Sequence, residues 1–415
     1  MKFVLIGVLT LAAAIQAENW PQWRGPFFNG STTETGLPST NERVAWVTPM
    51  PGYSGATPAV WGDNIFVSSP DEAKNLNLLC LDRRTGKIRW QKTLSDGDFA
   101  KGHNNMTSPS PVTDGQHVWV MYGNGIVAAL GMSGKLVWKR DLTKDHGKFS
   151  IMWIYGSSPL LYKGSLYIQV LQRNPPKYNH SLDEKPSRES FLLCLDPLTG
   201  KDRWRQLRKT DAIEESTEAY TTPVPNGNEI LVIGADYLTA HNPATGVELW
   251  RCAGLNPKHS NVFRMVPSPV VADGTIIICR PRRNALIAFH TGKLAWELDS
   301  IMPDVCTPLF YRGKLFVLDG DRQTFAQVDH QTGAIRWQGK LEVPGDLFRA
   351  SPTAADGKVY CISEKGNVFV LEAGDAFKIL STFKIAELPC RSSIVAAQGQ
   401  LFLRTGKNLY CIGKK

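Results

Sequence analysis

The chain has 415 residues, and its 47 lysine and arginine residues outnumber its 38 aspartate and glutamate residues, which gives a formal net charge of +9. The basic residues are spread along the chain instead of clustered, and no nucleic-acid-binding motif is present, so the sequence argues against a nucleic-acid partner. Beyond an N-terminal apolar run, no stretch is long enough to span a bilayer, and we expect no transmembrane segment.

Residues 1–17 have the pattern of a secretory signal peptide. Lys2 supplies the positive charge, residues 3–15 form an apolar run too short to span a membrane, and Ala17 is a small residue at the expected cleavage position. No cysteine follows the run, so we expect no lipid anchor of the bacterial type. The sequence predicts a secreted or periplasmic protein whose mature chain begins at Glu18.

Residues 18–43 form a lead-in before the first predicted strand. They open with the stretch 18–26, which contains two tryptophans, two prolines and one arginine. Proline restricts the backbone and tryptophan supplies a large apolar surface, so we expect this segment to pack across one face of the domain that follows. A ligand site in the lead-in is the alternative that the sequence leaves open.

A short phrase recurs along the rest of the chain. It is clearest at 192–205, where an apolar strand leads into the turn Asp196-Pro-Leu-Thr-Gly200 and then into a strand containing Trp204. The equivalent turn glycines are Gly86, Gly134, Gly200, Gly246, Gly292 and Gly333. Successive glycines are 48, 66, 46, 46 and 41 residues apart. A period of roughly 40–50 residues with several short strands is typical of a β-propeller blade.

Two phrases give the number of blades. Seven tryptophans mark outermost strands and are expected to pack between adjacent blades as structural anchors: Trp46, Trp90, Trp138, Trp204, Trp250, Trp296 and Trp337. A weaker segment, 377–380, takes the same place in one further blade. A small residue, usually followed by proline, opens each innermost strand, at Thr57, Ser110, Ser158, Thr222, Ser268, Thr307, Ser351 and Ser392-Ser393. Both phrases indicate eight blades.

The two ends of the repeat region complement each other. Residues 44–48 look like an outermost strand with no blade before them, and residues 391–412 supply three inner strands with no outermost strand after them. Pairing these ends would close the ring and remove its exposed edges. The sequence therefore predicts an all-β, eight-bladed β-propeller over 44–415, closed by an N-terminal strand that completes the last blade.

One interval is about twenty residues too long, and the excess lies at 169–190, between two strands of the third blade. Long ordered loops on repeat scaffolds often carry binding sites. A flexible surface loop with no binding role is an alternative that the sequence favours equally.

The eight cysteines are best explained as buried thiols. Cys80, Cys194 and Cys411 occupy equivalent strand positions in different blades, too far apart for a disulfide bridge. A disulfide between Cys252 and a cysteine in a neighbouring loop is an alternative that the sequence leaves open. No cysteine or histidine pair has metal-ligand spacing.

The Ser/Thr-Pro openings and the Leu-Asp-x-x-Thr-Gly-x-x-x-Trp closings together resemble the PQQ-like, or quinoprotein-type, repeat family. The resemblance covers about 44–412 and implies an eight-bladed propeller, a fold shared by pyrroloquinoline-quinone (PQQ) dehydrogenases and by BamB-like envelope scaffolds. The opening 20–26 is similar to that of exported bacterial PQQ-like repeat proteins. The chain departs from the dehydrogenases in lacking a pair of consecutive cysteines, and from BamB in lacking a lipid-anchor cysteine.

Propeller ligands bind over the central channel, on loops that lead into the innermost strands. These loops supply candidate ligand-binding residues: His103, Asn104, Trp153, Tyr155, Glu214, Glu218, Tyr220, Arg264, Arg349 and Arg391. For a quinone cofactor, the arginines would face its carboxylates and Trp153 would form an aromatic floor. Glu214, Glu215, Glu218 and Asn104 would offer oxygens to Ca²⁺, and Asp304 is the candidate base. A purely structural ion pair between Glu218 and Arg264 is the competing interpretation.

No nucleophile elbow, phosphate loop or zinc motif is present. The preferred hypothesis is therefore an exported, non-enzymatic binding or scaffold propeller of the cell envelope. It is expected to be a monomer and to take an envelope protein or glycan over its channel face. The alternative is a PQQ- or metal-dependent oxidoreductase of the quinoprotein type, with PQQ and Ca²⁺ as its cofactors.

Overall fold

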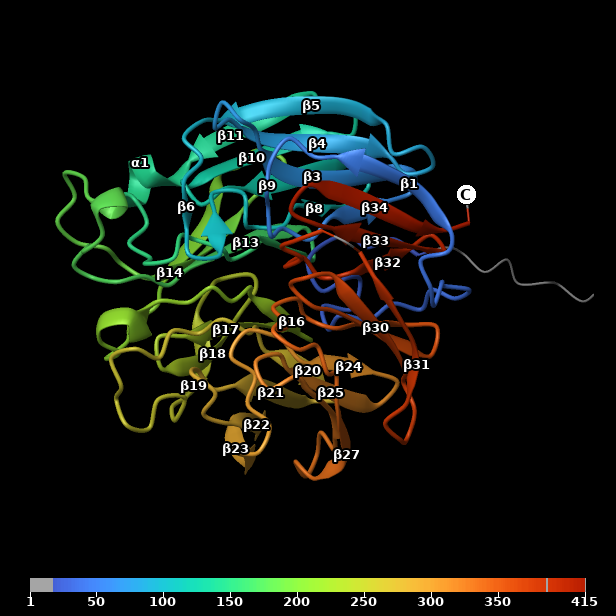
Figure 1. Cartoon of the computed structure of the whole chain (residues 1–415). Helices are drawn as coiled ribbons and strands as arrows, with labels where there is room; N and C mark the ends of the chain where they lie inside the picture. Colours follow the sequence, from blue (N-terminus) through green and yellow to red (C-terminus); the bar gives the residue numbers. More distant parts are fainter. Residues whose placement is uncertain (1–17, 386, 415) are drawn as a thin grey trace, which may run out of the picture.

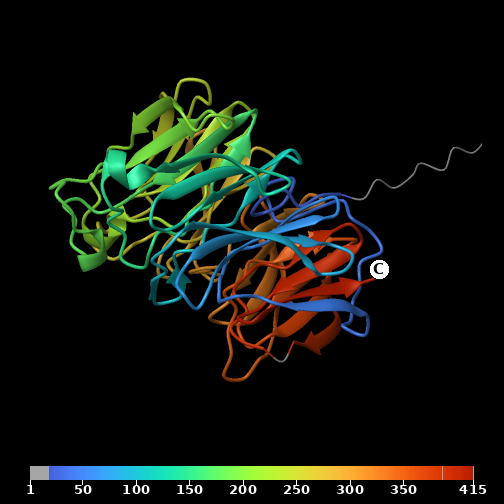
Figure 2. The same cartoon turned by 90° about the horizontal axis from the view of Figure 1, so that it is seen from above.

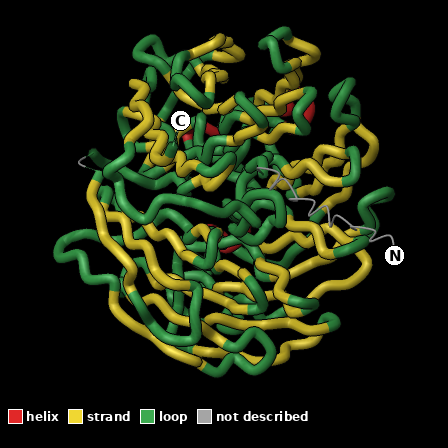
Figure 3. The backbone as a smooth tube through the Cα atoms, turned by 90° about the vertical axis from the view of Figure 1, so that its right-hand side faces the viewer, coloured by secondary structure: helices red, strands yellow, loops and turns green. Residues whose placement is uncertain are grey.

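Eight antiparallel sheets of four strands each surround a central axis (Figure 1). The computed structural model describes residues 18–385 and 387–414. Within those residues, helix is limited to α1 (Leu142–His146) and the 3-10 turns Asn179–Ser181 and Glu214–Thr217, and Figure 3 shows how strands and loops dominate the chain. In the part of the chain described, no helix is both long and apolar enough to cross a bilayer.

Each blade runs from an innermost to an outermost strand. Blades 1 to 4 are β2 (Ala59–Trp61), β3 (Asn64–Pro70), β4 (Leu76–Asp82), β5 (Ile88–Ser95); β8 (Val112–Thr113), β9 (His117–Met121), β10 (Ile126–Gly131), β11 (Leu136–Asp141); β12 (Leu160–Tyr162), β13 (Ser165–Val170), β14 (Phe191–Leu195), β15 (Asp202–Leu207); and β16 (Val224–Asn226), β17 (Glu229–Gly234), β18 (Tyr237–His241), β19 (Glu248–Cys252).

Blades 5 to 8 are β20 (Val270–Ala272), β21 (Thr275–Cys279), β22 (Leu286–His290), β23 (Lys293–Leu298); β24 (Leu309–Tyr311), β25 (Lys314–Asp319), β26 (Thr324–Val328), β27 (Ile335–Lys340); β28 (Thr353–Ala355), β29 (Lys358–Ile362), β30 (Asn367–Glu372), β31 (Ile379–Lys384); and β32 (Val395–Ala397), β33 (Gln400–Arg404), β34 (Asn408–Gly413), β1 (Val44–Pro49). A small hairpin, β6 (Ala100–Lys101) and β7 (Asn104–Asn105), stands outside the blades.

The eighth blade joins the two ends of the chain. Strand β1 pairs with β34, with Val44 opposite Ile412 and Trp46 opposite Cys411. In Figure 2 the blue N-terminal strand accordingly runs beside the red C-terminal strands. The predicted fold class, blade count and mode of closure are confirmed.

Tryptophans on the outermost strands connect successive blades. In six of the eight blades the indole nitrogen donates a hydrogen bond of 2.8–3.3 Å to a carbonyl in the outer turn of the next blade, as from Trp46 to Arg83 and from Trp204 to Pro243. Trp250 differs, because its nitrogen donates to Glu229 of its own blade, 2.8 Å away. The turn glycines carry positive φ, and at Gly86 an added Cβ would lie 2.6 Å from the Trp46 ring.

The seventh blade has no tryptophan, and its outermost strand starts later than predicted. Strand β31 begins at Ile379, not at residue 377, and Ser381 stands opposite Val370 where other blades place tryptophan. Phe377 precedes the strand and packs against Trp337 of the sixth blade, with ring centroids 5.9 Å apart. Phe377 therefore contacts the neighbouring blade instead of forming part of the strand, which explains the error in the predicted range.

The lead-in crosses the channel on the face where the first and second strands of each blade turn. Trp20 bridges to Val60 of blade 1, and the carbonyl of Pro21 accepts a hydrogen bond of 2.9 Å from the backbone of Thr113 in blade 2. Farther along the segment, Ser31 bridges to Ala354 of blade 7. We call residues 18–36 the strap. The lead-in thus packs across one face of the propeller, as the sequence predicts.

All eight cysteines lie in the described residues, and each is a buried free thiol. The third strands, which carry Cys80, Cys194 and Cys411, are almost wholly buried because neighbouring blades cover both of their faces. The signal peptide predicted for residues 1–17 lies outside the described residues.

Candidate functional site

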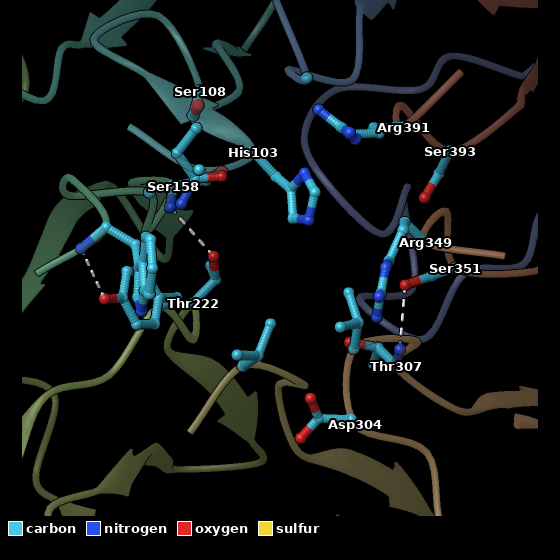
Figure 4. A pocket seen from close by; sticks show the side chains of 18 of the residues that line it. His103, Ser108, Ser158, Thr222, Asp304, Thr307, Arg349, Ser351, Arg391 and Ser393 are labelled. Carbon is cyan, nitrogen blue, oxygen red and sulfur yellow. Dashed lines mark hydrogen bonds between the residues drawn. The ribbon is translucent and has the colours of Figure 1, made fainter. Parts of the chain in front are cut away.

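A cavity of about 670 Å³ lies on the central axis of the ring. Figure 4 shows His103, Asp304, Arg349 and Arg391 arranged around the same open space. Its walls come from loops that enter the innermost strands and from turns between second and third strands. Antiparallel blades bring these two sets of loops to one face of the ring. We call this the channel face; the strap covers the opposite face.

A series of hydroxyl groups lines the cavity. Between consecutive blades, the backbone N–H at the start of one innermost strand donates to the hydroxyl at the same position in the next blade. Six such bonds of 2.8–3.1 Å run from Thr57 through Ser110, Ser158, Thr222, Ser268 and Thr307 to Ser351. The Ser/Thr-Pro phrase therefore does two things: it satisfies the backbone at the crowded axis and lines the cavity with hydroxyls.

The strap contributes the inner end of the cavity. Trp23 lines it, and the neighbouring Arg24 is buried between blades 6 and 7. The Arg24 guanidinium donates to the carbonyls of Pro308, at 2.6 Å, and Pro352, at 2.9 Å. Burial away from any carboxylate lowers the pKa of Arg24 to about 9. These contacts fix the strap to the ring, so the lead-in is part of the site as well as a cover.

Five arginines line the cavity against two aspartates, Asp304 and Asp321: Arg264, Arg282, Arg283, Arg349 and Arg391. Arg264 lies between Asp304, at 3.4 Å, and Glu215, at 3.6 Å. Arg349 pairs with Asp321 at 3.3 Å. These separations are long for charge-assisted hydrogen bonds, so Arg264 and Arg349 retain donor capacity, whereas Arg282 pairs with Glu215 at 3.0 Å.

Two guanidinium N–H groups in this wall are buried without a hydrogen-bond acceptor in the protein, Nη1 of Arg264 and Nε of Arg349. Burial and the charges of Arg391 and Arg349 lower the pKa of His103, so its imidazole is neutral at pH 7 and adds a polar contact without charge. A buried donor without a partner is costly, so these two guanidinium groups are held with incompletely satisfied hydrogen bonding.

An aromatic wall stands beside the arginines. The backbone N–H of Trp153 donates to the Tyr220 hydroxyl at 3.1 Å, and its indole N–H donates to Glu215 at 3.3 Å. The indole packs over Gly102, where an added Cβ would lie 2.7 Å from the ring. The Trp153 side chain is still 36% exposed, so part of its ring is open to a ligand.

Eight of the predicted site residues line the cavity: His103, Asn104, Trp153, Tyr220, Arg264, Asp304, Arg349 and Arg391. Tyr155 does not, because it is buried in the core between blades 2 and 3 and its hydroxyl donates to the Gln169 carbonyl at 2.8 Å. Glu214 and Glu218 also lie outside the lining. The ion pair suggested between Glu218 and Arg264 is not formed, since Arg264 pairs with Asp304 and Glu215 instead.

Glu214 and Glu218 anchor the insertion at 169–190. Glu214 pairs with Arg173, and the fully buried carboxylate of Glu218 accepts a hydrogen bond from the hydroxyl of Tyr178. The backbone N–H of Met152 also donates to Glu218, at 2.8 Å. Burial raises the pKa of Glu218 to about 7. The insertion is thus an ordered loop docked beside the channel face.

Several lining residues escaped the sequence analysis: Trp23, Tyr53, Arg282, Arg283 and Asp321. Arg282, Arg283 and Asp321 lie in turns between second and third strands, and only the loops into innermost strands were considered. Alternation of strand direction within a blade puts both sets of loops on one face. The predicted strand order could therefore have indicated that these turns also line the cavity.

The donor set does not suit a calcium ion. Within residues 18–385 and 387–414, no group of three or more histidine, cysteine, aspartate or glutamate side chains is placed to hold a metal. Glu214 and Glu218 are engaged by Arg173 and Tyr178, and Asp304 faces Arg264. The residues fit the carboxylates and the flat ring of an anionic ligand, but not the oxygen cage that Ca²⁺ needs.

Comparison with known proteins agrees with this architecture. The family model described as outer membrane protein assembly factor BamB matches residues 33–168, 188–309 and 234–413, which together make up most of the chain. The chain belongs to this family of PQQ-like repeat propellers. The unmatched residues 169–187 of this BamB-family propeller coincide with the insertion. None of the curated proteins compared matches the chain significantly in sequence.

Solved structures share the fold at low sequence identity. BamB from Moraxella catarrhalis is 13% identical with a TM-score of 0.65, covering 89% of this chain and 99% of its own. A europium-containing methanol dehydrogenase is 11% identical with a TM-score of 0.72, covering 95% and 98%. The quinohemoprotein alcohol dehydrogenase from Comamonas testosteroni is 12% identical with a TM-score of 0.70, covering 96% and 81%. The BamB-family propeller thus resembles both BamB and two dehydrogenases in fold.

Proposed function

We propose that this protein is a non-enzymatic binding or scaffold protein of the cell envelope that takes an anionic ligand into the cavity on its channel face. The ligand is an acidic segment of a partner protein or an acidic glycan. The observation that carries the proposal is the arginine wall of the cavity, five arginines against two aspartates, in which the ion pairs of Arg264 and Arg349 are 3.3–3.6 Å long. A carboxylate entering the cavity would supply closer acceptors for the Arg264 and Arg349 guanidinium groups than these long ion pairs do.

The shape of the cavity favours binding over passage. The strap crosses the opposite face, and Trp23 lines the inner end of the cavity. A ligand would therefore enter and leave by the channel face, between the arginines and the exposed part of Trp153. The series of hydroxyl groups adds donors and acceptors for sugar hydroxyls or peptide groups.

The experiment is a calorimetric titration with oligoglutamate and with oligogalacturonate at low salt, with a neutral oligosaccharide as reference. Arg264→Gln and Arg349→Gln should each weaken binding of the anionic probe about tenfold, the effect of one charge-assisted hydrogen bond. Arg84→Gln is the matched control, because Arg84 is exposed in an outer turn and pairs only with Asp63. Unchanged affinity in both cavity variants would contradict the proposal, and the preferred probe would separate protein from glycan.

A quinoprotein-type oxidoreductase is the second candidate, because the arginines and Trp153 match the carboxylates and ring of a quinone. The calcium donors it would need are not assembled. A melting experiment with PQQ, with and without millimolar Ca²⁺, discriminates the two functions. A calcium-dependent rise in Tm together with dye reduction by alcohols would replace the binding proposal. A rise in Tm with PQQ that does not depend on calcium would mean that PQQ binds in the cavity simply as an anion.

A further inference from the structure

Glu34 is a buried carboxylate at the end of the strap. It is 5% exposed and accepts backbone N–H bonds of 2.8 Å from Gln398 and from Gly399, in the turn between β32 and β33. Its third donor is the backbone nitrogen of Glu18. Among the described residues, no lysine, arginine or histidine side chain forms an ion pair with Glu34. A carboxylate buried without a cation is costly, so the site is built for a positive charge.

Residue 18 is held in place by contacts of its own. The Glu18 carboxylate accepts hydrogen bonds from the hydroxyls of Thr32 and Thr33 and, at 2.9 Å, from the backbone N–H of Thr33. Its carbonyl accepts a bond of 3.2 Å from the backbone N–H of Gln398. The nitrogen of residue 18 is therefore fixed against Glu34 by a preformed local structure.

We propose that cleavage of the peptide bond between Ala17 and Glu18 creates the missing cation. Hydrolysis by an export-associated endopeptidase consumes one water, leaves a carboxylate on Ala17 and frees an amine on Glu18. That amine takes up a proton at neutral pH, since the α-amino pKa is about 7.7–8.0 in model peptides. The new α-ammonium forms an ion pair with Glu34 and ties the strap to the eighth blade, so removal of the leader strengthens the fold.

The test compares two forms of the full mature chain: one beginning at Glu18 and one carrying a two-residue Ser-Gly extension. The extension keeps an N–H at residue 18 but moves the charge away. We expect the form with free Glu18 to melt roughly 2 °C or more above the extended form. Glu34→Gln should abolish this difference, whereas Glu42→Gln, which removes an exposed carboxylate from the same lead-in, should preserve it.

Equal melting temperatures of the two wild-type forms would overturn the proposal, and this comparison stands even if Glu34→Gln does not fold. N-terminal sequencing of the protein exported with its own leader supplies the second test. A chain starting at Glu18 is expected, and a different first residue would overturn the assignment. Neither result depends on ligand binding in the cavity.

Discussion

The indole of Trp46 donates a hydrogen bond of 2.8 Å to the main-chain carbonyl of Arg83. Trp46 stands on the strand that completes the eighth blade, and Arg83 lies in the outer turn of the first blade. The contact therefore joins the eighth blade to the first, and it repeats the link between neighbouring blades seen elsewhere in the molecule.

Replacing Trp46 with alanine tests this link. Trp46 is 9% exposed, so Trp46→Ala removes a nearly buried indole and its hydrogen bond, and should lower the free energy of unfolding by about 3–5 kcal/mol in guanidinium denaturation. Trp250→Ala is the matched control, because Trp250 donates within its own blade. An equal loss of unfolding free energy in the two variants would mean that the hydrogen bond between blades adds no measurable stability.

Gly86 and Gly292 form a second matched pair. Both have left-handed backbones, with φ of +73° and +76°, but an added Cβ at Gly86 would meet the Trp46 ring at 2.6 Å, while at Gly292 nothing lies within 4 Å. Gly292→Ala should cost about 1–2 kcal/mol from backbone strain alone. Gly86→Ala should cost roughly 1–3 kcal/mol more. Equal losses by thermal denaturation would count against tight packing of the indole on the turn.

The pH dependence of stability should report on Glu218. Burial raises its pKa in the folded protein to about 7 from the ordinary glutamate value of 4.5, so the folded state holds an extra proton between these values. Stability should therefore fall as the pH rises from about 4.5 to about 7, by roughly 2–3 kcal/mol. Glu218→Gln should remove that decline, and a parallel pH profile for variant and wild type would refute the assignment.

The fold was predictable because each blade repeats local chemistry. The Thr-Gly turns gave the period of the repeat, and the tryptophans and the Ser/Thr-Pro openings agreed on the number of blades. Only the outermost strand of the seventh blade was misplaced. There Ser381 replaces tryptophan, and the apolar Phe377 lies ahead of the strand.

The site was less predictable, because it depends on which loops share a face and on which partner each charge finds. Loops into the innermost strands pointed to His103, Arg264 and Arg349. The same loops also suggested Glu218, but its carboxylate accepts a hydrogen bond from Tyr178 of the insertion and does not line the cavity. Trp23 could not be placed from sequence, since its position depends on the path of the strap across the ring.

The most direct test of the account is a crystal structure of the protein with oligoglutamate or oligogalacturonate, whichever binds more tightly. We expect a carboxylate of the ligand inside the cavity, within hydrogen-bond distance of the Arg264 or Arg349 guanidinium group. A ligand bound only on the outer turns, with both guanidinium groups unchanged, would contradict the central claim that the channel cavity is an anion-binding site.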